Sequence, residues 1–212
     1  YMHNRILKFN PSSGTTQFVG EVIDHFKFSG TVKAKNGYLY GLPSNTGKVV
    51  KFNVTTLELD FIGDMYAGCD LKWKDCVIGI DDNIYGVPHS EKRWLKIDIT
   101  DDTTSLVSND LTKYGECKYE GGVVGEDDNI YAIPSDANNV IKLNTTTQIS
   151  SLIGNHYDGY GNWCGGVLHT NGCIYCSPCD NNKVLKIETN HIRDKGTKHI
   201  ETNPSLAEFN RA

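Results

Sequence analysis

The densest cluster of metal-ligating residue types in the sequence is the run Cys173-x-x-Cys176-x-x-Cys179. Thiolates at such spacing can bind zinc or an iron–sulfur cluster when a loop brings them together. This run, however, lies in a segment that reads as a β-strand, in which Cys176 would face away from the other two cysteines. Cys173 and Cys179 would then be about 20 Å apart, at ~3.3 Å per residue. We therefore expect neither a metal site nor a cofactor here.

A different cysteine pair, Cys164 and Cys179, flanks the turn predicted at Asn171-Gly172. A two-residue turn at this point would place the two cysteines directly opposite each other on neighbouring strands. Cβ atoms of such cross-strand neighbours are roughly 4.5–5.5 Å apart, slightly more than a disulfide prefers. Cys164 and Cys179 are thus candidates for a disulfide, with two free thiols as the alternative. Since the sequence has seven cysteines, an odd number, the redox compartment stays open.

Two carboxylate clusters, Asp81-Asp82-Asn83 and Asp127-Asp128-Asn129, have ligand types that suit calcium. The same positions hold Asn36-Gly37 and Asn171-Gly172 elsewhere in the chain, and all four pairs are typical of turns. We interpret the carboxylates as turn formers. No nucleophile elbow, phosphate-binding loop or HExxH motif is present, and the seven histidines are scattered, so we expect no catalytic residues.

These positions correspond because the chain is a repeat. Tyr40, Tyr85, Tyr131 and Tyr175 lie in the related segments LYGLP, IYGVP, IYAIP and IYCSP, separated by 45, 46 and 44 residues. Each unit reads as an apolar strand, a turn, a strand ending in proline, a strand of the VVKFN type and a Thr-rich strand. Four short strands in 43–46 residues are typical of one blade of a β-propeller. We predict an all-β propeller with about five blades visible.

We expect a single propeller domain over residues 1–212, and we favour a fragment of a larger ring over a permuted five-bladed ring. Its predicted parts are a half-blade at 1–20, blades at about 27–63, 72–108, 118–154 and 162–202, and a tail at 203–212.

The start of each repeat combines a cation or amide with an aromatic residue, as in Lys27-Phe28, Lys72-Trp73, Lys118-Tyr119 and Asn162-Trp163. Since the first strand of a blade lines the central channel, Lys27, Lys72 and Lys118 would form a partial ring at one mouth. Such a ring can hold an anion or an acidic side chain of a partner. The alternative is that these lysines pair with carboxylates between blades.

The loops at the same face are long and rich in the residue types of binding hot spots. Their candidate binding residues, together with one histidine of a neighbouring loop, are Tyr66, Tyr114, His156, Tyr157, Tyr160, Trp163 and His89. The alternative is that the tyrosines only pack the loops.

The repeat resembles those of kelch, WD-repeat and YncE-like propellers. DHFKFSGTVKAKNGYLYG, from Asp24 to Gly41, is similar to a blade of the tachylectin-type five-bladed lectins, which share Phe-Lys-Phe and Asn-Gly-Tyr-Leu-Tyr. This resemblance implies binding of acetylated amino sugars between neighbouring blades, at the starts of the first strands.

The net charge of −5, without a basic stripe, argues against nucleic acid as a partner. No apolar run approaches the roughly 18 residues of a membrane span. We predict a non-enzymatic binding or scaffold propeller that recognises a protein partner through its aromatic loops. The alternatives are a carbohydrate-binding propeller and an enzyme with a site at the channel mouth. A lectin should repeat its site residues, and these loops differ from repeat to repeat, which favours the scaffold. The compartment stays open.

Overall fold

The chain is built from short antiparallel strands. The computed structural model describes residues 5–20, 28–44, 47–68, 71–189 and 201–202. Within these ranges the structure is all β, apart from a 3-10 helix η1 (Thr112–Tyr114). No helix of this part of the chain is long and apolar enough to cross a bilayer.

The strands form one two-stranded sheet and four four-stranded sheets in the described residues, each in sequence order. The two-stranded sheet contains β1 (Ile6–Asn10) and β2 (Thr15–Val19). The first blade contains β3 (Phe28–Lys33), β4 (Leu39–Pro43), β5 (Val49–Phe52) and β6 (Leu59–Ile62). The second contains β7 (Trp73–Ile78), β8 (Ile84–Pro88), β9 (Trp94–Asp98) and β10 (Thr103–Val107). The third contains β11 (Tyr119–Val124), β12 (Ile130–Pro134), β13 (Val140–Asn144) and β14 (Ile149–Ile153). The fourth contains β15 (Trp163–Leu168), β16 (Cys173–Pro178), β17 (Leu185–Glu188) and β18 (Glu201–Thr202).

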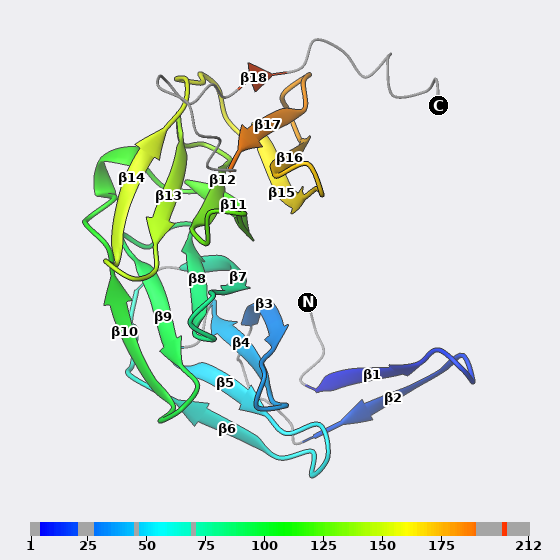
Figure 1. Ribbon diagram of the computed structural model, residues 1–212. Coiled ribbons are helices and arrows are strands. Elements are labelled where there is room, and N and C mark those ends of the chain that lie inside the picture. Colours follow the sequence, from blue (N-terminus) through cyan, green and yellow to red (C-terminus); the bar gives the residue numbers. More distant parts are fainter. Residues whose placement is uncertain (1–4, 21–27, 45–46, 69–70, 190–200, 203–212) are drawn as a thin grey trace.

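The sheets lie side by side along an arc, with the first strand of each blade on its inner side and the fourth strand outside (Figure 1). Adjacent blades contact each other mainly through these inner strands, β3 with β7, β7 with β11, and β11 with β15. Radial four-stranded sheets with their first strands at the centre are the architecture of a β-propeller. The predicted all-β propeller of four-stranded blades is confirmed.

The hairpin between the first two strands of each blade differs from the prediction. The paired residues Ala34 and Tyr38 enclose three residues rather than two, and the equivalent pairs in the other blades do the same. The last residue of each loop has a left-handed φ of 89°, 62°, 63° or 77°, at Gly37, Asp82, Asp128 and Gly172. A three-residue hairpin loop has this left-handed position, which glycine and aspartate occupy most readily. The extra loop residue shifts the predicted strand register by one.

Every first strand also contains a β-bulge, between Ser29 and Thr31 in the first blade and at the same place in the others. The bulges lie where the inner strands of neighbouring blades approach most closely. Gly121 has a φ of 110°, and a Cβ added to it would lie 2.6 Å from the Cα of Gly165. Only glycine fits such an approach. The bulge therefore fixes the spacing of adjacent inner strands.

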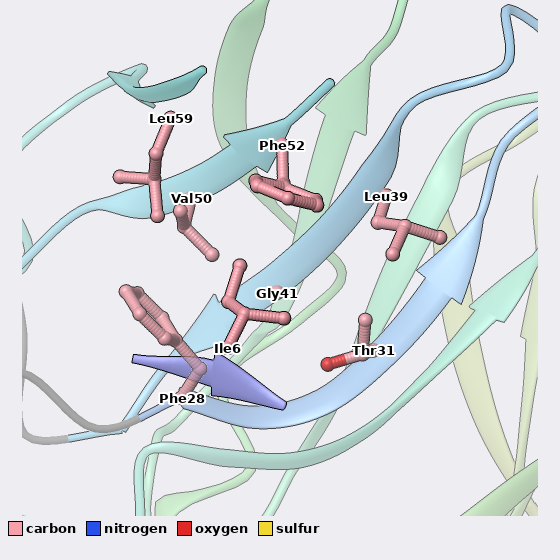
Figure 2. A pocket seen from close by; sticks show the side chains of 8 residues that line it. All are labelled: Ile6, Phe28, Thr31, Leu39, Gly41, Val50, Phe52 and Leu59. Carbon is pink, nitrogen blue, oxygen red and sulfur yellow. The ribbon is translucent and has the colours of Figure 1, made fainter. Parts of the chain in front are cut away.

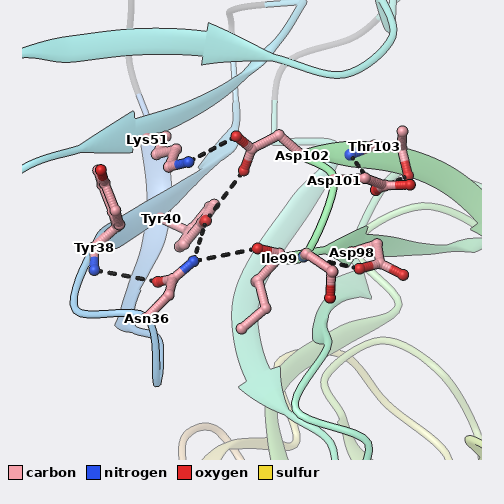
Figure 3. Close-up of polar contacts among 10 residues, drawn as sticks. Asn36, Tyr38, Tyr40, Lys51, Asp98, Ile99, Asp101, Asp102 and Thr103 are labelled. Atoms are coloured by element: carbon pink, nitrogen blue, oxygen red, sulfur yellow. Dashed lines mark hydrogen bonds and ion pairs between the residues drawn. The ribbon is translucent and has the colours of Figure 1, made fainter.

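Buried aromatic residues and a polar network hold neighbouring blades together. Trp73, Tyr119 and Trp163, at the start of the inner strands, are fully buried. At the opposite strand ends, the Lys51 ammonium lies 2.6 Å from the Asp102 carboxylate, and the Tyr40 hydroxyl contacts the same residue (Figure 3). Asp102 belongs to the next blade, so this network joins two sheets. Lys51 is one of the third-strand lysines, and its contact is structural.

Candidate functional site

Each blade presents two side chains at the inner side of the arc, where first strands begin and second strands end; we call this region the channel mouth. The inner mouth position follows the aromatic residue that begins the first strand, and the outer mouth position follows the proline that ends the second strand. The inner positions hold Ser29, Lys74, Glu120 and Cys164. The outer positions hold Ser44, His89, Ser135 and Cys179.

The backbone of the channel mouth repeats from blade to blade. The main-chain N–H of His89 donates to the carbonyl oxygen of Lys72 at 3.0 Å, and its own carbonyl accepts from the N–H of Lys118 at 3.0 Å. Ser135 makes the same two bonds, to Lys118 and Asn162, each at 2.9 Å. An outer mouth residue is thus clamped between the first strand of its own blade and that of the next. The scaffold is constant, and only the side chains change.

Opposite charges meet across two blades at the inner mouth positions. The Lys74 ammonium lies 2.6 Å from a carboxylate oxygen of Glu120, and the two side chains are 33% and 32% exposed. Lys74 stands on β7 and Glu120 on β11, next to their bulges. β-Bulges commonly redirect side chains beside active sites. The pair therefore lies at the two bulges and is partly open to solvent.

His89 is only 4% exposed and lies near enough to this ion pair for both of its charges to act on the imidazole. Burial lowers the pKa of His89, and the positive charges of Lys74 and Lys118 lower it further, while the negative charge of Glu120 raises it. Its Nδ1 lies 3.3 Å from the hydroxyl of Ser90. At neutral pH the imidazole is uncharged, which is the form that can accept a proton.

The fourth blade places two thiols at its mouth positions. The Sγ atoms of Cys164 and Cys179 are 2.7 Å apart. In register, however, the Cα partner of Cys164 is Ser177 rather than Cys179, because the three-residue loop and the bulge each shift the pairing. The prediction of directly opposed cysteines is wrong in register, and the two thiols meet because both occupy mouth positions.

The predicted lysine ring does not line the mouth. Lys72 and Lys118 are each 1% exposed, and their ammonium groups donate to main-chain carbonyl oxygens of Ser44 and Gly115, at 2.9 and 3.0 Å. A buried ammonium held by carbonyls is not open to an anion in solution. These two lysines connect loops and blades, whereas Lys27 lies outside the described residues. The channel-facing positions are two residues further along the chain.

Most predicted aromatic binding residues pack inside the loops. Tyr66 and Tyr157 contact Trp73 and Trp163 edge to face, with ring centroids 5.2 and 4.8 Å apart. His156 is exposed and lies 3.2 Å from the Asp158 carboxylate, and Tyr160 is 80% exposed. Trp163 itself is fully buried. The side chain of Tyr114 lies outside the described part.

Neither of two cavities elsewhere in the described residues has the chemistry of the mouth. One, of about 120 Å³, lies between β1 and the first blade and is lined by apolar groups such as Ile6, Phe28 and Leu59, with Thr31 as its polar residue (Figure 2). The other, of about 330 Å³, lies at the opposite strand ends, where Lys35 pairs with Asp82 at 2.7 Å. No group of three or more His, Cys, Asp or Glu residues in this part of the chain is placed to hold a metal.

Prediction from sequence identified His89, Cys164 and Cys179 and missed Lys74 and Glu120. A usable signal was present, because the residue after the aromatic residue of each first strand changes from serine to lysine, glutamate and cysteine while the aromatic position itself repeats. A position that varies in chemistry within a constant backbone is where a propeller can carry an asymmetric site.

The fold and the mouth together define a β-propeller with polar side chains gathered at one end of its channel. No protein-family model matches the sequence, and no curated protein matches it. Solved structures do. A catalytically inactive histidine-to-alanine variant of virginiamycin B lyase from Staphylococcus aureus, solved with quinupristin, is similar with a TM-score of 0.72 and 12% identity, covering 96% of this chain and 64% of that one.

Two further solved structures are similar over most of the chain. A streptogramin B lyase has a TM-score of 0.65 and 12% identity, covering 84% of this chain and 55% of that one. Hydrazine synthase from Kuenenia stuttgartiensis has a TM-score of 0.66 and 12% identity, covering 88% and 57%. The chain thus spans less than two thirds of the length of these proteins.

The structural neighbours correct the prediction of function. We predicted a non-enzymatic scaffold that recognises a protein partner through its aromatic loops. This prediction is contradicted by the structural neighbours that are named as lyases. The packing of Tyr66, Tyr157 and Trp163 takes three of the predicted binding residues out of that surface, and Tyr160 and His156 remain exposed. At 12% identity the likeness shows the fold.

Proposed function

We propose that the chain forms part of an enzymatic β-propeller whose active site lies at the channel mouth around Lys74, Glu120 and His89. The observation that carries the proposal is the Lys74–Glu120 ion pair beside a buried histidine of lowered pKa. These groups come from two adjacent blades and occupy positions that are chemically different elsewhere in the ring. A titratable group whose pKa is shifted by burial and by specific charged partners is typical of an active site.

The chemistry that suits this arrangement is removal of a proton next to a carbonyl group, followed by elimination. The neutral imidazole of His89 is the general base. The Lys74 ammonium stabilises the negative charge that develops on the carbonyl oxygen, and Glu120 holds Lys74 in place and balances the charge of the protonated imidazole. The electron pair of the broken C–H bond then forms a C=C double bond, and the leaving group departs from the neighbouring carbon with the electron pair of its own bond to that carbon. Each role uses a group already present in the charge state it needs.

The similarity to lyases supports this choice of reaction over hydrolysis. An elimination requires a base and an oxyanion-stabilising cation and no attacking water. The neighbour bound to quinupristin is inactive once one histidine is replaced, so a histidine is central on this fold in that protein. His89 is the histidine of this chain at the channel mouth among the described residues.

The test is an activity assay with the protein that contains the chain. Quinupristin and a panel of cyclic esters and amides with an acidic C–H next to the carbonyl serve as probes. Ring opening by elimination leaves the mass of a cyclic probe unchanged, whereas hydrolysis adds one water. We expect conversion without mass change, and a loss of about 10²–10⁴-fold in kcat/KM for Lys74→Met and His89→Asn.

Matched controls come from the same fold. Lys186 forms an ion pair with Glu188 at 2.8 Å, with 26% and 42% exposure, away from the mouth, and His169 is an exposed histidine at the opposite strand ends. Lys186→Met and His169→Asn should keep full activity. No conversion of any probe by the wild-type protein, or equal losses in the mouth and control variants, would contradict the proposal. Gain of one water would contradict elimination.

A further inference from the structure

We propose that Cys164 and Cys179 form a dithiol–disulfide redox site at the channel mouth. Their sulfur atoms are 2.7 Å apart, compared with about 2.0 Å in a disulfide bond. Oxidation therefore requires only a small approach of two side chains that already point at each other. Cys164 is half-buried and Cys179 is exposed, so a reagent in solution can reach this pair of thiols. Cys173 and Cys176, in contrast, are buried in the blade.

The backbone holds the two cysteines close before any bond forms. The N–H of Cys179 donates to the carbonyl oxygen of Asn162 at 3.0 Å, and Trp163 pairs with Pro178 in the next register position. A bulge follows Cys164, with Gly165 at a φ of 63°, so the Cys164 side chain stands where the regular strand pairing is interrupted. The approach of the thiols is thus a consequence of the clamp that shapes every mouth position.

The rest of the mouth shows that this pairing is specific to the fourth blade. The same two positions hold Ser29 with Ser44, Lys74 with His89, and Glu120 with Ser135. Of these four pairs, the one in the fourth blade is the one in which both side chains are oxidisable. The site adjoins the proposed active site, because Glu120 lies close enough for its charge to affect Cys179.

The reaction is thiol–disulfide exchange with a small-molecule disulfide. The Cys164 thiolate, which is half-buried, attacks one sulfur of that disulfide and displaces the first small thiolate. Cys179 then attacks the Cys164 sulfur of the mixed disulfide and displaces the second. The two protons of the cysteines pass to the two released thiols. The protein thiols are oxidised by two electrons, and the external disulfide is reduced by two.

The experiment uses oxidised glutathione as the probe and the complete chain, reduced and freed of reductant. After equilibration the remaining thiols are alkylated, and the digest is analysed by mass spectrometry. We expect a peptide cross-link between Cys164 and Cys179, with loss of two hydrogens and no attached glutathione, reversed by dithiothreitol. In Cys179→Ser the second step is blocked, so Cys164 should be trapped as a mixed disulfide with glutathione.

Cys117 supplies the matched control, because it is a half-buried thiol on a loop next to the mouth. Cys117→Ser should leave the cross-link unchanged. The proposal is overturned if both thiols of the wild-type chain are fully alkylated after equilibration, if they end as stable mixed disulfides, or if either joins Cys117 or Cys69 instead. The readout is covalent, so its outcome is independent of whether the proposed enzymatic activity exists.

Discussion

His89 combines three residue-scale features that rarely occur together outside functional sites. It is almost completely buried, it lies beside an ammonium–carboxylate pair, and it remains neutral because burial and two neighbouring lysines lower its pKa. Burial of a histidine without such neighbours would lower its pKa as well. The charges distinguish this site, since Lys74 and Glu120 act on the imidazole in opposite directions and either charge can be removed by substitution.

The lowered pKa of His89 predicts how stability depends on pH. As the pH falls below about 6.5, the unfolded chain binds the proton before the folded protein does, so the free energy of unfolding decreases toward the folded-state pKa. The contribution is fully present above this range. His89→Asn should reduce the pH dependence by up to about 1.4 kcal/mol per pH unit. Urea unfolding at several pH values measures it.

The control for this prediction is His169→Asn, because this substitution replaces an exposed histidine and leaves the buried His89 in place. Its pH dependence should follow that of the wild-type protein below pH ~6.5. An unchanged slope in His89→Asn would show that His89 titrates normally and would remove the base from the proposed site.

At the scale of elements, the β-bulge determines which residues face the channel. The repeat of tyrosines, prolines and turn residues was sufficient to predict the strands and the blades. The repeat was not sufficient to predict which residues of the first and second strands pair with each other. A bulge inserts one unpaired residue without any fixed sequence signature, and a loop of three residues has the same Asn-Gly or Asp-Asp pairs as a loop of two. The mouth therefore contains Lys74 rather than Lys72, and Cys164 pairs with Ser177.

The glycine of the third bulge should be the least replaceable residue of the mouth. A Cβ at Gly121 would lie 2.6 Å from Gly165 Cα, at a φ of 110° that side chains rarely adopt. We expect Gly121→Ala to destabilise the protein by roughly 2–4 kcal/mol in urea unfolding. Gly115 is the control, since it has a φ of 81° and open space around its Cα. Gly115→Ala should cost about 1–2 kcal/mol, and equal losses would contradict a close inter-blade approach.

At the scale of the molecule, the blades along the arc share the same backbone scaffold and differ in the side chains at their mouth positions. Sequence repetition revealed the scaffold, because the same buried positions recur in every blade. The same repetition obscured the site. A position that differs between repeats looks like an ordinary substitution in the sequence, and its meaning becomes visible only when the structure places the blades next to one another. Lys74, Glu120 and His89 come from two blades, and their proximity is a property of the arc rather than of any one repeat.

The backbone amides of the two-stranded sheet should be less protected from hydrogen exchange than those of the blades. β1 and β2 carry exposed apolar side chains, with Leu7 57%, Phe9 59% and Phe18 46% exposed, whereas every residue of β12 is buried. A sheet with two strands and unpaired edges opens easily. In hydrogen exchange of the 212-residue chain, its amides should exchange at least ~100-fold faster than those of β12. Equal protection would mean that β1 is covered in solution.

The central claim is that Lys74, Glu120 and His89 form one electrostatically coupled site. The most direct measurement is an NMR titration of the His89 imidazole in the wild-type chain and in Lys74→Met and Glu120→Gln. We expect a wild-type pKa of His89 below the ordinary value of about 6.5, an increase of this pKa in Lys74→Met and a decrease in Glu120→Gln. A His89 pKa that is the same in all three proteins would contradict it.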